Sequence, residues 1–432
     1  MSVNKVNVVT MGCSKNLIDS ERLLSMFAKA GIKAFHNADG FSGGAVVINT
    51  CGFIGDAKEE SINTILEACQ LKSEGVIDRV YVMGCLSERY RKELPAEIPE
   101  VDGWYGKFDW SGIIDSLVPA KKIDHTSYDR CLTTLSHHAY IKIAEGCNRF
   151  CAFCAIPLIT GRYRSRAVDD IVNETKALVA RGVSEFNVIA QDLSFYGHDL
   201  YGHSALAELV GRMAETEGVR RIRLHYAYPS DFPYDVLPVM AAHPNVCKYL
   251  DIALQHIDDQ VLRNMHRHIT AAETRELLDR IRREVPGIHI RTTLMVGFPG
   301  ETQDAFDRLV DFVREQRFER MGAFAYCEEE DTAAAREFND DIPQEVKQQR
   351  LDIIMAEQET ISLELNETKI GKILEVVIDS ENDDYYVGRT EFDSPEVDPE
   401  VLVKKTKKLS VGDYVMVRID EAMPFELIAT AV

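Results

Sequence analysis

Short apolar runs alternate with helical patterns along most of this chain, and this alternation restricts the possible folds more than any other feature. In residues 1 to about 120, VNVVTMGC is followed by SERLLSMFAKAG, GAVVINTC by DAKEESINTILEACQ, and RVYVMGC by SERYRKEL. A strand–helix rhythm of this kind predicts a mainly parallel sheet. Each of the three predicted strands ends in a cysteine: Cys13, Cys51 and Cys85. Ligands of open α/β sheets bind beyond the carboxyl ends of the strands, so these cysteines can converge on one point.

A second strand–helix series predicts a barrel or partial barrel of six βα units, with its site at the carboxyl ends of the strands. The candidate strands are residues 139–144, 185–191, 221–226, 249–254, 288–296 and 321–326. A long helical pattern over residues 345–369 closes this region. From about residue 370, apolar residues recur at every second position, which indicates β-strands. Five such short segments predict a small antiparallel barrel of the oligonucleotide-binding type.

These patterns predict an α/β chain of three domains. We place an N-terminal parallel α/β domain at residues 1–124, a central partial (βα)6 barrel at 133–364 and a small five-stranded antiparallel β-barrel at 365–432. The first residues, MSVNKVNVVT, do not resemble a secretory signal peptide, so a cytoplasmic location is expected. Even the longest uncharged stretch, which includes residues 41–55, is too short and polar to span a membrane.

Ten cysteines in such a chain argue against a disulfide framework, because clustered cysteines in a reducing compartment more often bind metal or perform chemistry. The formal net charge of −21 disfavours a general phosphate-binding surface. The negative charge favours a basic partner, because molecules of opposite charge attract each other as they approach. The alternative is that the acidity serves only solubility.

The segment EGCNRFCAFC, residues 145–154, carries three cysteines in the spacing C-x3-C-x2-C. Ferredoxin-type clusters use four cysteines, and zinc sites usually pair two CxxC or CxxH units, so neither pattern fits. A [4Fe–4S] cluster held by three thiolates leaves one iron open for a substrate or cofactor. The alternative is a zinc knuckle completed by a nearby histidine, such as His137 or His138.

This spacing, placed after the first strand of a βα barrel, resembles the radical S-adenosylmethionine superfamily. The resemblance implies that Cys147, Cys151 and Cys154 hold a [4Fe–4S] cluster. Its open iron would bind S-adenosylmethionine, which is cleaved to a 5′-deoxyadenosyl radical that abstracts hydrogen from carbon. Phe153 would shield the cluster or serve only in packing. Gln191 and Asp192, which follow the second strand, are candidates for contacts with S-adenosylmethionine.

The contexts MGCSKN, NTCGFI and MGCL resemble the N-terminal domain of methylthiotransferases within that superfamily. This resemblance covers the whole chain, and the C-terminal barrel looks like a TRAM domain. It implies that Cys13, Cys51 and Cys85 hold a second [4Fe–4S] cluster, whose open iron carries the sulfur. The other cysteines are predicted to be structural: Cys69, Cys131, Cys247 and Cys327. Three arginines are candidates for a carboxylate or phosphate contact, or lie in solvent at a helix start: Arg162, Arg164 and Arg166.

Methylthiotransferases modify either tRNA or a ribosomal protein, and the C-terminal barrel bears on this choice. Residues 370–432 contain 14 Asp and Glu against 7 Lys and Arg, and nine of the acidic residues lie between positions 379 and 400. Such a surface should repel a phosphate backbone and attract a basic protein. The stretch KKTKK, residues 404–408, is either an RNA contact or an exposed strand edge.

GCSKNLIDSE, CGFIGDAKEES and VGRTEFDSPEVD resemble the branch that acts on small-subunit ribosomal protein S-twelve. This implies that a methylthio group is added to the β-carbon of an aspartate in that protein, free or in the ribosome. A sulfur donor and an electron donor are further implied partners, and neither tRNA nor a membrane is expected. Two rivals remain at this point: a tRNA-adenosine methylthiotransferase with an unusual acidic barrel, and a non-catalytic iron–sulfur electron carrier.

Overall fold

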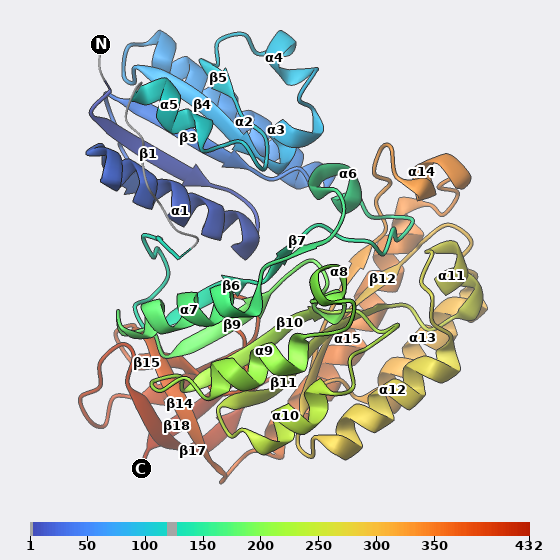
Figure 1. Ribbon diagram of the computed structural model, residues 1–432. Helices are drawn as coiled ribbons and strands as arrows, with labels where there is room; N and C mark the ends of the chain where they lie inside the picture. The colour runs from blue at the N-terminus through green and yellow to red at the C-terminus, as the bar shows by residue number, and fades with distance from the viewer. Residues whose placement is uncertain (1–2, 119–127) are drawn as a thin grey trace. The chain divides into compact units, whose positions relative to one another are not determined.

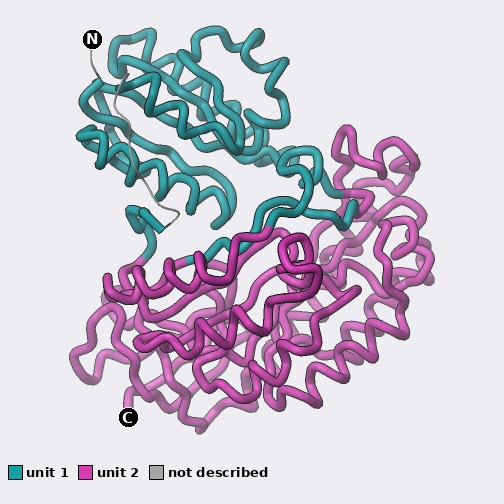
Figure 2. The backbone as a smooth tube through the Cα atoms, in the orientation of Figure 1, with its two compact units in different colours: residues 1–134, 140–150, 154–164 teal, residues 135–139, 151–153, 165–432 magenta. Residues whose placement is uncertain are grey.

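A computed structural model describes residues 3–118 and 128–432 of the chain (Figure 1). The predicted end of the first domain, residue 124, lies outside these ranges. The backbone divides into two compact units (Figure 2). The first comprises residues 1–134, 140–150 and 154–164, and the second comprises residues 135–139, 151–153 and 165–432. In the described part of the chain, no helix combines the length and apolar character needed to cross a membrane.

The first unit contains a parallel sheet with the strand order β2-β1-β3-β4-β5. The strands are β1 (Lys5–Thr10), β2 (Lys33–His36), β3 (Ala45–Thr50), β4 (Arg79–Gly84) and β5 (Gly103–Trp104). The helices are α1 (Ser14–Ala30), α2 (Gly55–Ser73), α3 (Cys85–Arg89), α4 (Leu94–Glu97), α5 (Gly112–Leu117) and α6 (Ile156–Thr160). The three strands expected from sequence are confirmed. The short edge strands β2 and β5 extend the sheet beyond them.

Helices cover both faces of this sheet, and the central strand shows why. All residues of β3 are buried, and its side chains alternate between two cores. Val47 packs with Phe27 of α1 in one core, whereas Ile48 packs with Ile65 of α2 in the other. A strand that is buried on both faces has apolar residues at successive positions, as AVVI in β3 does.

The central sheet has the order β13-β12-β11-β10-β9-β6. Its strands are β6 (His138–Lys142), β9 (Glu185–Ile189), β10 (Arg221–Ala227), β11 (Val246–Gln255), β12 (His289–Val296) and β13 (Arg320–Ala325). Strands β9 to β13 pair in parallel, and β6 starts in the second unit and ends in the first. All six predicted strands are confirmed, in a sheet that stays open between β6 and β13.

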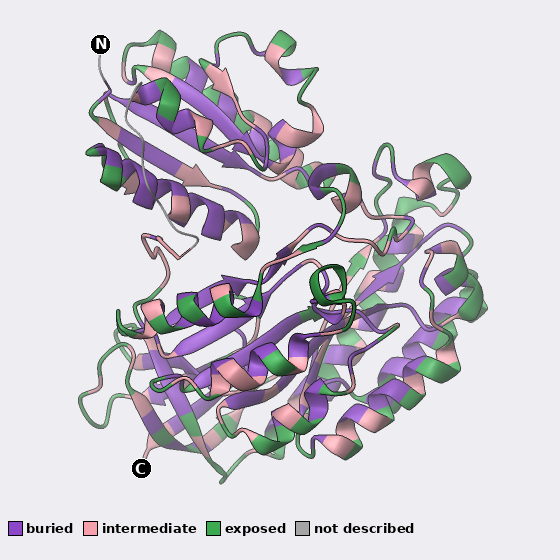
Figure 3. Cartoon of the chain, in the orientation of Figure 1, coloured by how far each residue is buried: buried purple, intermediate pink, exposed green. Residues whose placement is uncertain are grey.

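Helices connect the strands of the central sheet, and Figure 3 shows the contrast between largely buried strands and helices with an exposed face. The longer helices are α7 (Val168–Val179), α9 (Leu206–Ala214), α10 (Val236–Ala242), α12 (Ala271–Glu284), α13 (Gln303–Gln316) and α15 (Gln344–Glu367). The short elements are β7 (Ala144–Glu145), β8 (Arg164–Ser165), η1 (Leu193–Phe195), α8 (His198–Tyr201), α11 (Asp259–Asn264) and α14 (Ala333–Glu337). Helix α15 packs against β13, as expected for the element that ends the series.

The C-terminal strands form a closed barrel in the order β14-β15-β16-β18-β17. They are β14 (Ile373–Glu381), β15 (Tyr385–Arg389), β16 (Glu400–Lys404), β17 (Tyr414–Ala422) and β18 (Glu426–Ala431). The expectation of a wholly antiparallel barrel is wrong for one pair, because β16 and β18 run parallel. The barrel closes through this pair, and β17 reaches β18 by an ordinary antiparallel turn.

The barrel and the central sheet belong to one unit, and buried ion pairs join them. The carboxylate of Glu185, at the start of β9, accepts hydrogen bonds from Arg223 at 2.5 Å and from Arg389 of the barrel at 2.7 Å. All three side chains are buried. Burial opposes ionisation of Glu185, but the two arginines outweigh it and hold the pKa of this carboxyl well below its usual range.

Residues 390–398 continue this contact, and they correct one expectation. Asp393 pairs with Arg320 of β13 at 2.6 Å. Asp398 accepts hydrogen bonds from Tyr249 at 2.7 Å and Arg291 at 3.2 Å. The acidic residues between positions 379 and 400 therefore do not form one exposed surface: Asp393 and Asp398 face arginines of the central sheet. Figure 1 shows the barrel beside the strands of that sheet.

Replacing Glu185 by glutamine should lower the free energy of unfolding by about 3–5 kcal/mol, because two buried arginines lose their shared carboxylate. The matched control is Glu208→Gln, which removes one partner of an exposed ion pair with Arg212. Its effect should stay within about 0.5 kcal/mol. Urea unfolding of the two variants at neutral pH makes the comparison. Equal losses would contradict the assigned role of Glu185.

Candidate functional site

The first three predicted site cysteines lie at equivalent points of the N-terminal sheet. Cys13 immediately precedes α1, Cys51 follows β3, and Cys85 is the first residue of α3 directly after β4. Because β1, β3 and β4 are neighbours in the sheet, the three loops that carry these cysteines are neighbours too. The geometry therefore supports convergence of Cys13, Cys51 and Cys85 at one edge of the sheet.

A glycine beside each cysteine lets these loops approach closely. Gly12 has φ +83°, and a β-carbon there would lie 2.9 Å from Cys51 Cβ and 3.0 Å from its Sγ. A β-carbon on Gly52 would lie 2.7 Å from the Cα of Leu86, next to Cys85. Gly84 has φ +102° and leaves no room for a side chain above the backbone of β3. Each of these three loops therefore packs tightly against a neighbouring loop or strand.

The three cysteines also affect one another's pKa values, because a negative charge on one disfavours ionisation of the next. Burial raises the pKa of Cys85 to about 12; Lys107 opposes this shift, and the Cys13 and Cys51 thiols add to it. Burial likewise raises the pKa of Cys51, and the Cys13 thiol contributes to the shift. Three mutually repelling thiolates are a costly arrangement in a protein by themselves. A cationic cluster is the kind of ligand that makes such a set favourable.

Cys13 differs from its two neighbours. Part of this residue is exposed, but many protein atoms surround its thiol, and their desolvation alone would raise its pKa. The ammonium groups of Lys15 and Lys107, with backbone N–H groups of Lys15 and Asn16, outweigh this effect, so the pKa lies below its ordinary value. Thiolate is the form that binds metal, and Cys13 is the member of the set that most readily adopts it.

A buried polar network supports this edge of the sheet. Lys107 donates to Asp19 at 2.6 Å and to the side-chain oxygen of Asn16 at 2.9 Å. Lys142 donates to the other Asp19 oxygen at 2.6 Å. The Cys85 thiol in turn lies 3.5 Å from Asn16 Oδ1. Sequence reasoning missed this network, because its members are far apart in the chain and carry no motif.

The segment EGCNRFCAFC crosses between the two units. Cys147 and Cys154 belong to the first unit, and residues 151–153 belong to the second. In the first unit, Gly146 has φ +82°, and a β-carbon there would meet the carbonyl of Arg162 at 2.2 Å. The backbone N–H of Cys147 donates to Gly161 at 3.2 Å, which fixes the start of the loop. Arg162 also stacks on the exposed ring of Phe150, 4.8 Å away.

In the second unit, the backbone of residues 151–153 is anchored on both sides. The Ala152 N–H donates to Met265 at 2.9 Å, and its carbonyl accepts from Ala334 at 2.7 Å. The Cys151 sulfur lies 3.4 Å from an Arg267 nitrogen and 3.7 Å from the Tyr228 hydroxyl. Neither Arg267 nor Tyr228 was predicted from sequence.

Phe153 packs edge-on against Phe298, with ring centroids 6.5 Å apart. Its packing role is therefore confirmed, and its shielding of a cluster stays a prediction. Asp192 is buried and caps η1, since its carboxylate accepts from Ser194 N at 2.8 Å. A contact between S-adenosylmethionine and Gln191 or Asp192 likewise stays a prediction.

The histidines proposed for a zinc alternative have other surroundings. His137 Nε2 lies 2.8 Å from an Asp379 oxygen, inside the second unit. The His138 ring lies edge-on to His137, and burial lowers the pKa of His138 to about 4. Across residues 3–118 and 128–432, no three His, Cys, Asp or Glu side chains stand close enough to hold a metal ion as they are placed. The ligand sets at the six cysteines therefore remain predictions.

The other cysteines and the three candidate arginines have separate surroundings. Cys69 and Cys247 are buried, and Cys131 packs against the first core, as structural cysteines should. Cys327 is exposed. Arg166 pairs with Asp170 at 2.7 Å and with the fully buried Glu174 at 2.6 Å, so the expectation that it lies in solvent is wrong. Arg162 and Arg164 are exposed, as that alternative expected.

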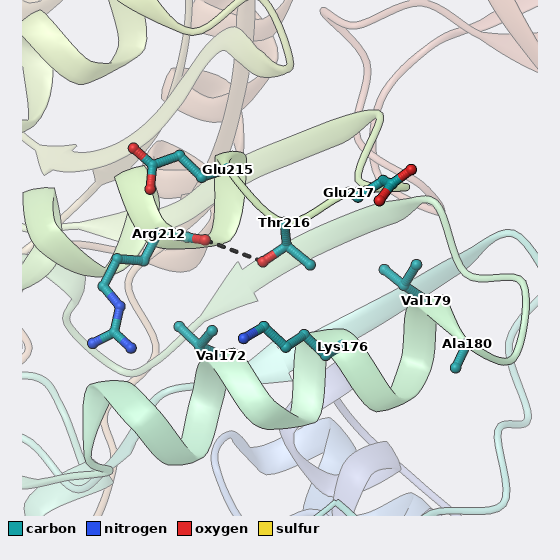
Figure 4. A pocket seen from close by; sticks show the side chains of 8 residues that line it. All are labelled: Val172, Lys176, Val179, Ala180, Arg212, Glu215, Thr216 and Glu217. Atoms are coloured by element: carbon teal, nitrogen blue, oxygen red, sulfur yellow. Dashed lines mark hydrogen bonds between the residues drawn. The ribbon is translucent and has the colours of Figure 1, made fainter.

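A cleft of about 500 Å³ lies in the second unit between α7 and the end of α9 with the turn after it. Figure 4 shows the side chains that line it. Its lining residues are Val172, Lys176, Val179, Ala180, Arg212, Glu215, Thr216 and Glu217. Arg212 is already paired with Asp169 at 2.6 Å. None of the predicted site residues lines this cleft.

Comparison with known families agrees with this arrangement. Residues 141–313 match the Radical SAM superfamily, residues 5–106 match the uncharacterized protein family UPF0004, and residues 370–432 match the TRAM domain. The superfamily implies a [4Fe–4S] cluster and S-adenosylmethionine. The first match lies on the central sheet, the second on the N-terminal sheet and the third on the barrel.

Solved structures show the same fold at low sequence identity. The radical S-adenosylmethionine methyltransferase TsrM from Kitasatospora setae superposes with a TM-score of 0.55 at 16% identity, covering 74% of this chain and 72% of that one. The cobalamin-dependent S-adenosylmethionine radical enzyme OxsB superposes with a TM-score of 0.52 at 11% identity, covering 83% of this chain and 58% of that one.

Curated relatives are far closer in sequence. Proteins named ribosomal protein uS12 methylthiotransferase RimO are 56% identical in Parabacteroides distasonis, over 99% of both chains, and 56% identical in Phocaeicola vulgatus, over 100% of both. The protein of that name from Bacteroides fragilis is 53% identical over 99% of both chains. The chain therefore belongs to the RimO family of radical SAM methylthiotransferases.

Proposed function

We propose that this enzyme adds a methylthio group to the β-carbon of an aspartate in ribosomal protein uS12. One observation carries the proposal: within the first unit, α3, which begins at Cys85, packs against α6, which follows Cys154. A segment of each cysteine set thus lies beside a segment of the other. Sulfur delivery to a carbon radical requires such proximity, because the radical must meet its sulfur before a side reaction.

The six cysteines are the proposed ligands. Cys147, Cys151 and Cys154 would hold the cluster that binds S-adenosylmethionine, and Cys13, Cys51 and Cys85 would hold the second one. When bound, a cluster with an open iron supplies the electron that cleaves S-adenosylmethionine and so provides the hydrogen-abstracting radical. Gly12, Gly52, Gly84 and Gly146 let the backbone fold tightly beside these ligands.

The surrounding residues have supporting tasks. Asn16 and Lys107 brace the loop of Cys85, and Lys107 also favours the thiolate of Cys13. Gln191 and Asp192 are proposed contacts of S-adenosylmethionine. We place the borders of the three domains at residues 1–124, 133–364 and 365–432. The proposed setting is the cytoplasm, with a separate electron donor and a separate source of sulfur.

The charge of the barrel supports a basic protein as substrate. Some of its carboxylates are paired internally, but Asp383 and Asp384 are exposed in the β14–β15 turn. In the KKTKK stretch, Lys404 pairs with Asp420 at 3.1 Å and Lys405 pairs with Glu381 at 3.0 Å. These pairs reduce the positive field that a phosphate backbone would need.

Mass spectrometry distinguishes the protein substrate from tRNA. Reconstituted enzyme, S-adenosylmethionine and a reductant are incubated separately with purified uS12 and with tRNA. We expect uS12 to gain the mass of one methylthio group in place of one hydrogen, and tRNA to stay unchanged. A gain on tRNA alone would identify a tRNA-adenosine methylthiotransferase, and the absence of any S-adenosylmethionine cleavage would identify an electron carrier.

A further inference from the structure

A buried arginine faces the sulfur of Cys151 inside the second unit. Arg267 is 4% exposed, and one of its terminal nitrogens lies 3.4 Å from Cys151 Sγ. Its other terminal nitrogen donates to the backbone carbonyl of Ala253 in β11. The guanidinium is therefore fixed between a strand of the central sheet and the cysteine loop.

The charge of Arg267 has no carboxylate partner among the described residues, and its Nε has no hydrogen-bond partner there either. Other buried arginines of this unit, such as Arg223 and Arg320, pair with Glu185 and Asp393. Burying an unpaired cation is costly, so an anion is expected beside Arg267. The Cys151 sulfur, as a thiolate, is the group in position to supply it.

Tyr228 completes the arrangement. Its ring lies 3.9 Å from the guanidinium carbon of Arg267, a cation–π contact that fixes the plane of that group. Its hydroxyl lies 3.7 Å from the same Cys151 sulfur. A side chain from the loop after β10 and one from the turn after α11, both able to donate hydrogen bonds, thus converge on one sulfur atom.

The backbone is bent to place Arg267. Helix α11 ends in a turn in which His266 N donates to Arg263 O at 3.0 Å and Arg267 N donates to Leu262 O at 2.8 Å. This hydrogen-bond pattern usually has glycine at the left-handed position. Here that position is His266, with φ +55°. A non-glycine residue in this conformation costs about 1 kcal/mol or more, and the turn that it forms carries Arg267.

We propose that Arg267, oriented by Tyr228, is a positioning residue that sets the reduction potential of the cluster held by Cys147, Cys151 and Cys154. The inference rests on the proposed function, since it requires that cluster. Reduction adds one negative charge to the cluster, and a cation and hydrogen bonds at a ligand sulfur stabilise that charge. Arg267 therefore makes the cluster easier to reduce.

Electron paramagnetic resonance during a redox titration tests this role. The background carries Cys13→Ala, Cys51→Ala and Cys85→Ala, so that only the cluster of Cys147, Cys151 and Cys154 contributes. Arg267→Met should make reduction at least about tenfold less favourable, because a charged hydrogen bond is lost. That corresponds to a midpoint potential about 59 mV more negative for a one-electron couple. The control is Arg263→Met, which changes an exposed arginine in α11, just before that turn, and should leave the potential unchanged.

Tyr228→Phe keeps the ring and removes only the hydroxyl, so it serves if Arg267→Met fails to fold. It should shift the equilibrium in the same direction by about threefold. Potentials equal to that of Arg263→Met in both folded, iron-containing variants would overturn the inference. If the background with Arg267 intact binds no iron, the proposed function fails instead, because the ligand set at Cys147, Cys151 and Cys154 is then wrong.

Discussion

Replacing Cys151 by alanine should abolish formation of 5′-deoxyadenosine and, with it, methylthio transfer to uS12. Three thiolates are the minimum proposed for this cluster, so losing one removes a ligand that the rest of the loop cannot replace. Loss of even a supporting group around a metal ligand costs 10–100-fold, so we expect a decrease of at least about 100-fold here. Liquid chromatography of reaction mixtures with the wild type and the variant measures the product.

Cys327→Ala is the matched control for this experiment. Cys327 is exposed and lies outside both cysteine sets, so its loss should leave 5′-deoxyadenosine formation near the wild-type level. Full activity of Cys151→Ala would show that the C-x3-C-x2-C segment does not hold the cluster that cleaves S-adenosylmethionine. Loss of activity in both variants would point to a general effect of cysteine replacement.

Replacing Cys13, Cys51 and Cys85 together should separate the two halves of the reaction. Anaerobically reconstituted wild type should bind about eight irons per chain, and the triple alanine variant about four. Sulfur insertion should stop, because the proposed sulfur-carrying cluster is gone. Formation of 5′-deoxyadenosine should persist, because Cys147, Cys151 and Cys154 are intact.

Iron analysis and product analysis of the same preparation check this prediction together. A companion variant, Cys69→Ala, changes a buried cysteine that packs in the second core of the N-terminal unit and should keep all the iron. If the triple variant also keeps all its iron, the N-terminal cysteines hold no cluster. If it loses iron but still transfers the methylthio group, the sulfur comes from elsewhere.

The strands and the cysteine positions were predictable because they depend on local sequence. A short apolar run such as AVVI between two helical patterns is typical of a strand buried on both faces, and its end then places Cys51. The glycine beside each of Cys13, Cys51 and Cys85 is also visible in the sequence. Its meaning, close approach of three loops, appears only when the loops are placed.

Contacts between distant residues were not predictable. Arg267 and Cys151 are 116 positions apart, and Arg320 and Asp393 are 73 apart, with no motif that links either pair. Asp393 and Asp398 therefore looked like surface charge. The parallel pair β16–β18 was missed for a related reason, since a period of two predicts strands but not their direction.

The central claim is that the radical made at the cluster of Cys147, Cys151 and Cys154 removes a β-hydrogen from an aspartate of uS12. Label transfer tests it most directly. Ribosomal protein uS12 carrying β-deuterated aspartate is incubated with the enzyme, and both products are analysed by mass spectrometry. We predict deuterium in 5′-deoxyadenosine and a methylthio group on one aspartate of uS12. A methylthiolated uS12 accompanied by deuterium-free 5′-deoxyadenosine would contradict the account.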